Sequence, residues 1–369
     1  MTGRLAILAP LKQWGGIERK MLILCREFVA RGNDVEFILT RGGQVPYPDE
    51  FPAEVRIVDL QSRHKLDAIP RLVRHLRNSR PDALLTAKDH AAKVAVIARR
   101  LSGVDARVVV KVTNTLSETL RRKGKRRMAR WLYPRADGII AVSRGVKEDM
   151  ISHFGMDPER IRVIYNPTVT PDMAERAIQP SGHPWLDTDN TPVVMAAGRL
   201  TPQKDFTTLL RAFALLRKER PCRLVILGEG PERPALEALS LELGIDADFL
   251  LAGYQGDPLP WMGRAAVFAL SSRYEGLGNV LVEAMAVGTT VVSTDCPSGS
   301  AEILEDGRYG ALVNVGDYQA LAHAVAGALD RPMPREQLEQ GAQRFRSDLI
   351  SEQYLAMLGL EGSSCARAD

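Results

Sequence analysis

Residues 271–295 read SSRYEGLGNVLVEAMAVGTTVVSTD. They predict the end of one strand, a glycine turn, a helix over 279–287 and a second strand over 289–295. A strand, a helix and a strand in this order form the repeating unit of a parallel sheet. Because the helix is apolar on every side except at Glu283, we expect it to be buried.

Two acids, Glu275 and Glu283, frame this turn and helix. A buried carboxylate needs hydrogen-bond donors or a charge partner. Gly276 and Gly278 allow close approach of the backbone just before a helix N-terminus, where anions are favoured. A phosphate at the turn and hydroxyl groups at the two acids would account for both features. The pattern therefore indicates a site for a nucleotide sugar.

The alternation of strands and helices runs through the whole chain and restarts once. Strands are predicted at 4–10, 34–40, 55–60, 82–87, 106–112 and 137–143, and again at 191–200, 223–230, 248–254, 266–272 and 289–295. Helices are predicted at 16–31, 69–79, 91–102, 144–154, 205–219, 231–243, 279–287, 317–329 and 335–358. Buried strands separated by helices form parallel, doubly wound sheets, and their ligands lie beyond the carboxyl ends of the strands.

We therefore expect an α/β fold with two Rossmann-like doubly wound domains that face a central cleft. The first domain would cover 1–168, with a Pro-, Gly- and Asp-rich linker at 169–190. The second would cover 191–340. A C-terminal helix and tail, 341–369, would return toward the first domain.

The composition excludes several classes of protein. No run approaches the roughly 18 apolar residues that span a bilayer, and the N-terminus resembles a first strand more than a cleavable signal. The cysteines, Cys25, Cys222, Cys296 and Cys365, lack metal-ligand spacing, which favours buried thiols. Residues 1–170 hold 32 Lys and Arg against 18 Asp and Glu, whereas the remainder carries a net charge of −10. We expect an anionic partner that touches only the first half.

Two further motifs follow the first strand of each predicted domain. Arg199 and Lys204 lie between a buried strand and an amphipathic helix, where they could clamp a diphosphate leaving group. Gly15 and Gly16 precede a helix that begins near Ile17. That turn lacks the full GxGxxG pattern, so a purely structural role remains an alternative.

Three segments together carry a family resemblance: GRLTPQKDF (198–206), GEGPER (228–233) and EGLGNVLVEAMAVGTTVVSTDCPSGSAEIL (275–304). They resemble the retaining GT-B glycosyltransferases of family GT4, and the likeness covers essentially the whole chain. The resemblance implies that Arg199 and Lys204 bind the donor diphosphate, that Glu275 faces the donor sugar and that Glu283 holds the ribose hydroxyls. The nucleobase of the donor would lie near Glu229–Gly230 and 253–255.

The resemblance also implies a metal-independent reaction with no cofactor other than the nucleotide-sugar co-substrate. The catalytic residues that we expect are Glu275, Arg199 and Lys204. The donor-binding residues that we expect are Gly15, Gly16, Arg199, Lys204, Gly230, Glu275, Gly276, Leu277, Gly278, Asn279, Val280 and Glu283.

The chain departs from the family pattern in its first half. Many members carry a His after the fifth strand of the first domain, close to the transferred sugar, and Thr113 occupies that position here. Asn114 could replace the missing contact by hydrogen bonding. Asp89 and His90 are further acceptor-side candidates, although capping of a helix is an alternative role for Asp89. If the acceptor attacks from the face of the leaving group, the leaving phosphate can take its proton, so no protein base is required.

A basic, aromatic-flanked segment lies at 117–137, with seven basic residues within 121–130. This composition is typical of an interfacial membrane element. A solvated flexible loop is the alternative, and nucleic acid is disfavoured because no recognition motif accompanies the charge. The residues of the expected membrane patch are Arg121, Arg122, Lys123, Lys125, Arg126, Arg127, Arg130 and Trp131.

The sequence thus predicts a glycosyltransferase that moves a hexose or N-acetylhexosamine from a nucleotide sugar, with UDP favoured over GDP. Its acceptor would be a lipid-linked or membrane-surface glycan in cell-envelope polysaccharide, oligosaccharide or glycolipid synthesis. We expect it in the cytoplasm, peripheral on the inner face of the cytoplasmic membrane. Two alternatives remain: a GT-B-fold UDP-sugar epimerase and an inactive membrane-associated scaffold.

Overall fold

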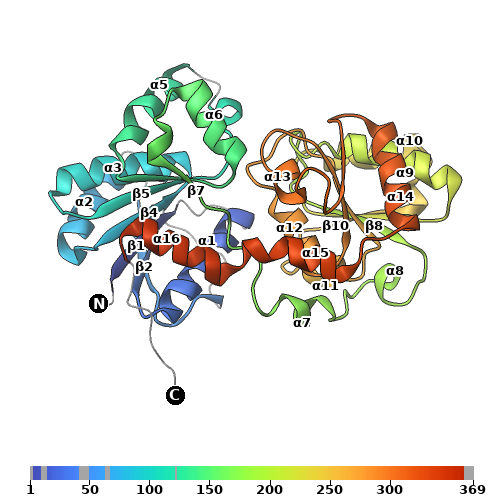
Figure 1. Cartoon of the computed structure of the whole chain (residues 1–369), viewed down its shortest axis with the longest axis horizontal. Coiled ribbons are helices and arrows are strands. Elements are labelled where there is room, and N and C mark those ends of the chain that lie inside the picture. The colour runs from blue at the N-terminus through green and yellow to red at the C-terminus, as the bar shows by residue number, and fades with distance from the viewer. Residues whose placement is uncertain (1–2, 10–14, 41–49, 63–66, 121–122, 361–369) are drawn as a thin grey trace. The chain divides into compact units, whose positions relative to one another are not determined.

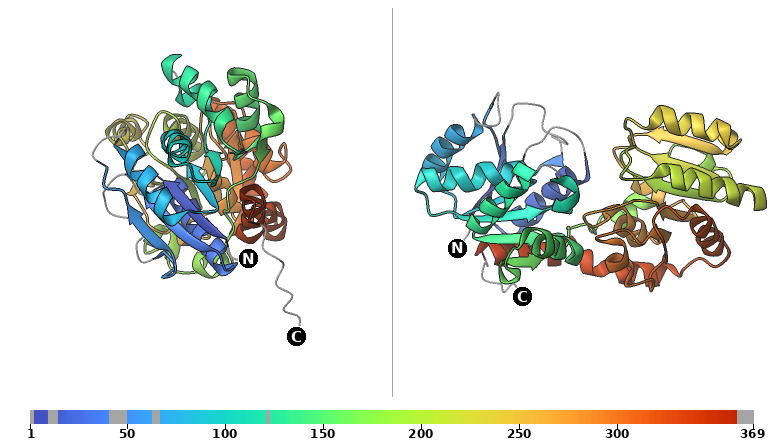
Figure 2. Two further views of the ribbon diagram at one scale, coloured as in Figure 1. Left: turned by 90° about the vertical axis from the view of Figure 1, so that its left-hand side faces the viewer. Right: turned by 90° about the horizontal axis from the view of Figure 1, so that it is seen from above.

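The computed structural model describes residues 3–9, 15–40, 50–62, 67–120 and 123–360 (Figure 1). The chain divides into two compact units, one made of residues 1–167 with 347–369 and the other of residues 168–346. Each unit contains one parallel sheet with helices on both of its faces (Figure 2). The expected pair of α/β, doubly wound units is confirmed. Every described strand pair is parallel, as short buried strands between helices predict.

The sheet of the first unit has the strand order β3-β2-β1-β4-β5-β6-β7. Its strands are β1 Arg4–Ala9, β2 Asp34–Leu39, β3 Arg56–Asp59, β4 Ala83–Ala87, β5 Arg107–Val112, β6 Gly138–Ala141 and β7 Ile161–Val163. Helices α2 (Ala68–Ser79) and α3 (Asp89–Ser102) pack together on one face. Helices α1 (Gly16–Ala30) and α16 (Ser347–Leu358) share a core with the strands on the other face.

Three shorter helices complete the first unit. They are α4 (Leu116–Thr119), α5 (Lys123–Leu132) and α6 (Arg144–Phe154). Of these, α5 lies within the basic segment and α4 overlaps its start, where we expected an interfacial membrane element or a flexible loop. The loop alternative is wrong, because Lys123–Leu132 form the helix α5. This helix buries Ala129 and Leu132, which are three positions apart and so lie on one side of it.

The sheet of the second unit has the order β10-β9-β8-β11-β12-β13. Its strands are β8 Val193–Ala197, β9 Arg223–Leu227, β10 Phe249–Gly253, β11 Val267–Leu270, β12 Thr290–Thr294 and β13 Ala311–Val313. One face packs on α9 (Phe206–Glu219), α10 (Arg233–Glu242) and α14 (Tyr318–Asp330). Around the other face lie α11 (Leu259–Met262), α12 (Asn279–Ala286), α13 (Ser300–Leu304) and α15 (Arg335–Ala342).

Two expected boundaries differ in the structure. The segment 169–190 is not a free linker: it contains α7 (Met173–Ala177) and α8 (Pro184–Asp187) and belongs to the second unit. An ion pair of 2.8 Å between Arg176 Nη2 and Asp257 Oδ1 fastens it there. The helical stretch expected over 335–358 is interrupted near residues 343–346, so α15 belongs to the second unit and α16 to the first.

The return of α16 has a visible cause. Its Tyr354, Leu355 and Leu358 lie in the apolar core beneath the first sheet. Arg31, the C-cap residue of the neighbouring helix α1, donates from Nη2 to the carbonyl oxygen of Asp348 at 2.9 Å. Burial of apolar side chains against α1 and the sheet therefore holds α16 in the first unit.

The strand order places a topological switch point in each sheet. In the first unit, the chain continues from β1 toward one edge of the sheet and from β4 toward the other edge. In the second unit, it does the same from β8 and β11. Ligands of open α/β sheets bind beyond the carboxyl ends of the strands at such a point. The loops that follow these four strands are therefore where a site is expected.

Candidate functional site

The carboxyl ends of β8 and β11 bring Lys204 and Glu275 together. Lys204 Nζ lies 2.6 Å from Glu275 Oε1, and the two side chains are only 15% and 10% exposed. The hydroxyl of Ser272 donates to the same carboxylate oxygen at 2.7 Å. The buried acid therefore has a cation and a hydrogen-bond donor, as a carboxylate removed from water requires.

Backbone contacts join the two loops that carry this pair. Arg273 N donates to Gln203 O at 2.8 Å, and Gln203 Nε2 donates to Tyr274 O at 2.9 Å. Ser271 Oγ donates to the carbonyl oxygen of Lys204 at 2.8 Å. The pair is thus held on a rigid support at the switch point of the second sheet.

Glycines in the loop after β9 allow this loop to pack closely against the loop after β8. The backbone of Gly228 has a φ of +140°, and a Cβ atom there would collide with the carbonyl oxygen of Gly198. A Cβ atom on Gly230 would collide with Leu200 O, and Leu200 N donates to Glu229 O at 2.9 Å. The GEG sequence therefore serves close packing of the loops after β8 and β9. That packing places Gly230 next to the loop that carries Lys204.

The glycine turn after Glu275 leads directly into α12. Gly276 and Leu277 are buried, and Gly278 occupies the N-cap position with a φ of +87°. The next loop along the sheet packs on this turn, because Gly299, with a φ of +112°, lies against the carbonyl group of Leu277. The turn and the first residues of α12, Asn279 and Val280, form a helix N-terminus beside the Lys204–Glu275 pair.

Glu283 differs from our expectation of a buried carboxylate. Its side chain is only partly buried, whereas Leu281, Val282, Ala284 and Met285 are buried. Helical periodicity explains the difference, because positions 279, 280, 283 and 286 form the less buried stripe of α12. Glu283 therefore lies on the same side of the helix as the turn-proximal Asn279 and Val280.

Arg199 is the second expected cation, and it behaves differently from Lys204. It is exposed at the carboxyl end of β8, and its guanidinium group forms no ion pair with the described part of the chain. In the described part of the second unit, the loop after β8 therefore carries Lys204 in an ion pair and Arg199 outside one. The sequence pattern alone could not distinguish the two.

In the first unit, the switch point carries a pair that the sequence analysis missed. Lys88 Nζ pairs with Glu18 Oε1, and Glu18 is 7% exposed. Lys88 has a φ of +75°, which is rare for a residue with a side chain. Gly15 faces this pair, since a Cβ atom there would lie 3.1 Å from Glu18 Oε2, while Gly16 begins α1 with open space around it.

The structure also changes the interpretation of Asp89 and His90. The N-cap of α3 is Lys88, so Asp89 is not the capping residue; it lies in the first turn. Its carboxylate contacts Lys93 Nζ at 2.6 Å and the hydroxyl of Tyr133 at 3.3 Å. Burial and the adjacent Asp89 raise the pKa of Tyr133 well above its usual value. His90 follows, partly buried.

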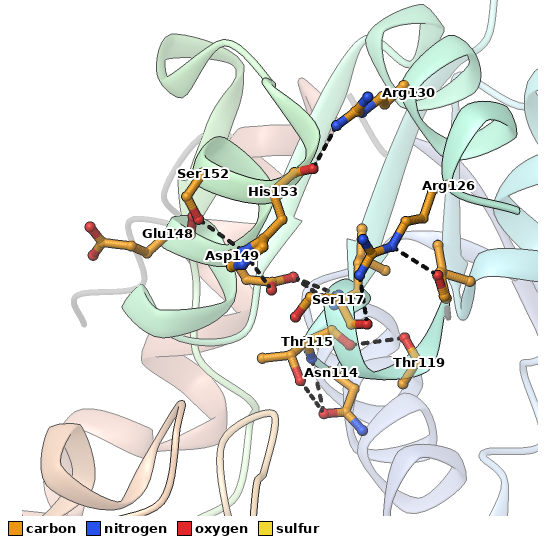
Figure 3. A network of polar contacts seen from close by, with 12 residues as sticks. Asn114, Thr115, Ser117, Thr119, Arg126, Arg130, Glu148, Asp149, Ser152 and His153 are labelled. Atoms are coloured by element: carbon orange, nitrogen blue, oxygen red, sulfur yellow. Dashed lines mark hydrogen bonds and ion pairs between the residues drawn. The ribbon is translucent and has the colours of Figure 1, made fainter. Parts of the chain in front are cut away.

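Thr113 and Asn114 follow β5 and are both partly buried. The side chain of Asn114 accepts a hydrogen bond from the backbone N–H of Thr115 at 2.9 Å. Asp149 on α6 and Arg126 on α5 contact the same segment from two sides (Figure 3). The sequence pattern did not single out Asp149, although it lies six residues after the N-cap serine of α6, Ser143.

Two family profiles match the chain over most of its length. Residues 14–170 match the profile of Glycosyltransferase Family 4, and residues 191–331 match that of Glycosyl transferases group 1. The chain belongs to glycosyltransferase family 4.

Curated relatives of this family member include two bacterial enzymes. It is 32% identical over 199 residues to the N-acetylgalactosamine-N,N'-diacetylbacillosaminyl-diphospho-undecaprenol 4-alpha-N-acetylgalactosaminyltransferase of Campylobacter jejuni, covering 54% of this chain and 52% of that one. It is 35% identical over 234 residues to the lipopolysaccharide core biosynthesis glycosyltransferase LpsE of Rhizobium meliloti, covering 61% and 65%. The alignments thus span between half and two thirds of these relatives.

Solved structures extend the comparison to the full length. Anabaena HepE in complex with UDP matches with a TM-score of 0.77 at 22% identity, covering 96% of this chain and 99% of that chain. The lipopolysaccharide outer core galactosyltransferase WaaB matches with a TM-score of 0.74 at 21% identity, covering 96% and 99%. At such identities the likeness shows the fold, which is GT-B, as the sequence predicted.

Two cations of the expected membrane patch also make contacts within the first unit. Arg126 donates to two backbone carbonyl groups, and Arg130 Nη2 donates to His153 O at 2.9 Å. The cations of α5 that remain exposed without such a bond are Lys123, Lys125 and Arg127, and Trp131 beside them is 50% exposed. Arg121 and Arg122 lie outside the described residues. None of the described helices is long and apolar enough to cross a bilayer.

The described cysteines are buried. Cys296 is 3% exposed, and burial raises the pKa of its thiol to about 11, which disfavours the reactive thiolate. Cys25 and Cys222 are likewise buried free thiols, and Cys365 lies outside the described residues. Within the described ranges, no group of three or more His, Cys, Asp or Glu side chains is placed to hold a metal ion.

Proposed function

We propose that the protein is a retaining, metal-independent glycosyltransferase that uses a UDP-sugar and a lipid-linked or membrane-surface glycan acceptor. One observation carries the proposal: Lys204 and Glu275 form a nearly buried pair at the switch point, beside the N-terminus of α12. A paired acid and lysine there offer both an acceptor and donors to sugar hydroxyls. The helix N-terminus and the exposed Arg199 offer positive charge to a diphosphate.

The proposed reaction exchanges one bond to the anomeric carbon for another. The bond between that carbon and the leaving phosphate oxygen breaks, and a bond to the acceptor oxygen forms on the same face. The leaving phosphate takes the proton of the acceptor hydroxyl. Arg199, Lys204 and the backbone N–H groups of 276–280 would stabilise the charge that develops on the UDP product. Glu275 would orient the sugar and Glu283 the ribose.

The choice of substrate class rests on the relatives. The Campylobacter relative is named for a diphospho-undecaprenol acceptor, and HepE is a structural neighbour in complex with UDP. We therefore assign a UDP-hexose or UDP-N-acetylhexosamine as the donor, and envelope glycan synthesis as the process. The exposed cations of α5, with Trp131 and the 45% exposed Met128, support contact with an anionic membrane surface.

The proposal is tested with a panel of UDP- and GDP-sugars. Radiolabelled donors are incubated with lipid-linked glycans extracted from the envelope of the organism that encodes the protein, and nucleotide release and lipid-bound label are measured. We expect lipid-bound label from a UDP-sugar, with the α-anomeric configuration of the donor retained in the product. Lys204→Ala and Glu275→Ala should abolish transfer. Lys218→Ala, an exposed lysine on α9, is the matched control and should not.

Each rival activity predicts a different result in the same assay. Interconversion of UDP-sugars without transfer would indicate an epimerase. Nucleotide binding without turnover on any lipid extract would indicate an inactive scaffold. Full activity after removal of divalent ions by a chelator is expected, and its loss would refute the metal-independent mechanism.

A further inference from the structure

The segment after β5 is held by an acid from a different helix. The carboxylate oxygen Oδ2 of Asp149 accepts the backbone N–H groups of Leu116 at 2.7 Å and Ser117 at 3.1 Å. Asp149 is 8% exposed, so these bonds form in a largely water-excluded place. They satisfy the first N–H groups of α4, a helix of 4 residues that is too short to be stable by itself.

A cation holds the other end of the same segment. Arg126 donates from Nε to Leu120 O and from Nη2 to Ser117 O, both at 3.1 Å. Its guanidinium group also lies 5.9 Å from the ring of Phe154 on α6. Residues 116–120 are therefore fixed between α5 and α6 (Figure 3). Arg126, which the composition assigns to a membrane patch, thus also donates two hydrogen bonds to this segment.

A local hydrogen bond orients Asn114, which lies two residues before the fixed segment. The backbone N–H of Thr115 can only donate, so the side-chain atom of Asn114 that faces it at 2.9 Å is the amide oxygen. The amide nitrogen must then point the opposite way, and Figure 3 shows it directed away from the network. At the carboxyl end of β5, Asn114 thus presents two N–H donors that this network does not use.

We infer that Asp149 and Arg126 are positioning residues that hold the amide of Asn114 ready to donate to a substrate oxygen. This inference rests on the proposed function and deepens it, because a sugar hydroxyl or ring oxygen is the oxygen available in that reaction. A hydrogen bond contributes to catalysis only when its donor is already at the right place, so the rigidity of residues 114–120 matters as much as the donor. Asn114 touches the substrate, and Asp149 acts through it.

The test compares single and double variants of the full chain in the label-transfer assay, with UDP-glucose, UDP-galactose, UDP-N-acetylglucosamine and UDP-N-acetylgalactosamine as donors and the envelope lipid extract as acceptor. We expect Asn114→Ala and Asp149→Ala each to lower kcat for transfer by about tenfold or more, the cost of a lost hydrogen bond to a charged or reacting group. The double variant should lose no more than Asn114→Ala alone. Losses that multiply would refute an action of Asp149 through Asn114.

Conservative and matched variants separate positioning from folding. In Asp149→Asn, the amide oxygen can take the place of Oδ2 and accept both N–H groups, so transfer should stay within about threefold of the parent. Glu148→Ala, exposed on the same helix, is the control. Thermal stabilisation by UDP should be unchanged in every variant. An Asp149→Ala protein with normal kcat would overturn the inference, and a parent protein that transfers no label would overturn the proposed function itself.

Discussion

Replacing Lys204 by methionine removes one charge from the Lys204–Glu275 pair and keeps most of the aliphatic chain. That chain packs over Gly198, so the apolar contact survives. The side chains are 15% and 10% exposed, and Nζ and Oε1 are 2.6 Å apart. Breaking such a buried pair costs about 3–5 kcal/mol because a carboxylate stays buried without its cation. In a unit of this size each kcal/mol lowers the melting temperature by roughly 2–4 °C, so we expect a fall of about 6–20 °C.

The double variant Lys204→Met, Glu275→Gln separates stability from chemistry. It removes both charges, and replacing a whole buried ion pair by uncharged side chains changes the free energy of unfolding little. Ser272 can still donate to the amide oxygen at position 275. We therefore expect most of the lost stability to return. Transfer activity should remain reduced by about 10²–10³-fold in all variants, because the groups proposed to stabilise the transition state are gone.

Scanning calorimetry measures the first effect and the label-transfer assay measures the second. Lys218→Met, on the exposed side of α9, is the matched control and should change neither. A Lys204→Met protein that melts within about 1 °C of the parent would show that the buried pair carries no stability. A double variant with parental transfer would show that the site lies elsewhere.

Three further predictions concern other parts of the molecule. Burial lowers the pKa of Lys111 to about 7 from its ordinary 10.5, so between these pH values the native state has lost a proton that the unfolded chain keeps. Lys111→Met should therefore stabilise the protein by up to about 5 kcal/mol below pH 7, where the buried lysine is charged. Denaturant titrations should show this gain vanishing as the pH rises to 10.5. Gly228→Ala should abolish the thermal stabilisation by UDP, since its methyl group would collide with Gly198 O. Gly256→Ala should not, because a methyl group added there would enter open space. The exposed cations of α5 are Lys123, Lys125 and Arg127. Replacing all three by glutamine should lower the affinity for anionic vesicles, measured by sedimentation, roughly 100-fold, at about 1 kcal/mol per cation. Unchanged sedimentation would refute the membrane contact.

Much of the secondary structure could be predicted because local patterns carry it. The strands are buried on both faces, so they appear as short apolar runs between helices. The predictions failed where that contrast is weak. Strand β13 has three residues and no fully buried side chain. Helix α5 is so rich in cations that its two buried positions, Ala129 and Leu132, were overlooked.

The candidate site was predictable as a set of residues but not as an arrangement. The motifs identified Lys204 and Glu275, which are 71 positions apart, without indicating that they pair. The same motifs did not separate Arg199, exposed and without an ion pair among the described residues, from Lys204. Asp149 carried no sequence signal, because a carboxylate on a helix is ordinary until a distant N–H group is brought to it.

The sequence by itself determined the α/β class, the restart of the pattern in a second unit and membership of the glycosyltransferase family, since these depend on local periodicity and on short motifs. Only the tertiary structure decided which charges pair, how far Glu283 is buried and that α16 packs in the first unit. Those properties depend on free energies of contact between segments far apart in the chain. Neither hydrophobic period nor motif spacing contains that information.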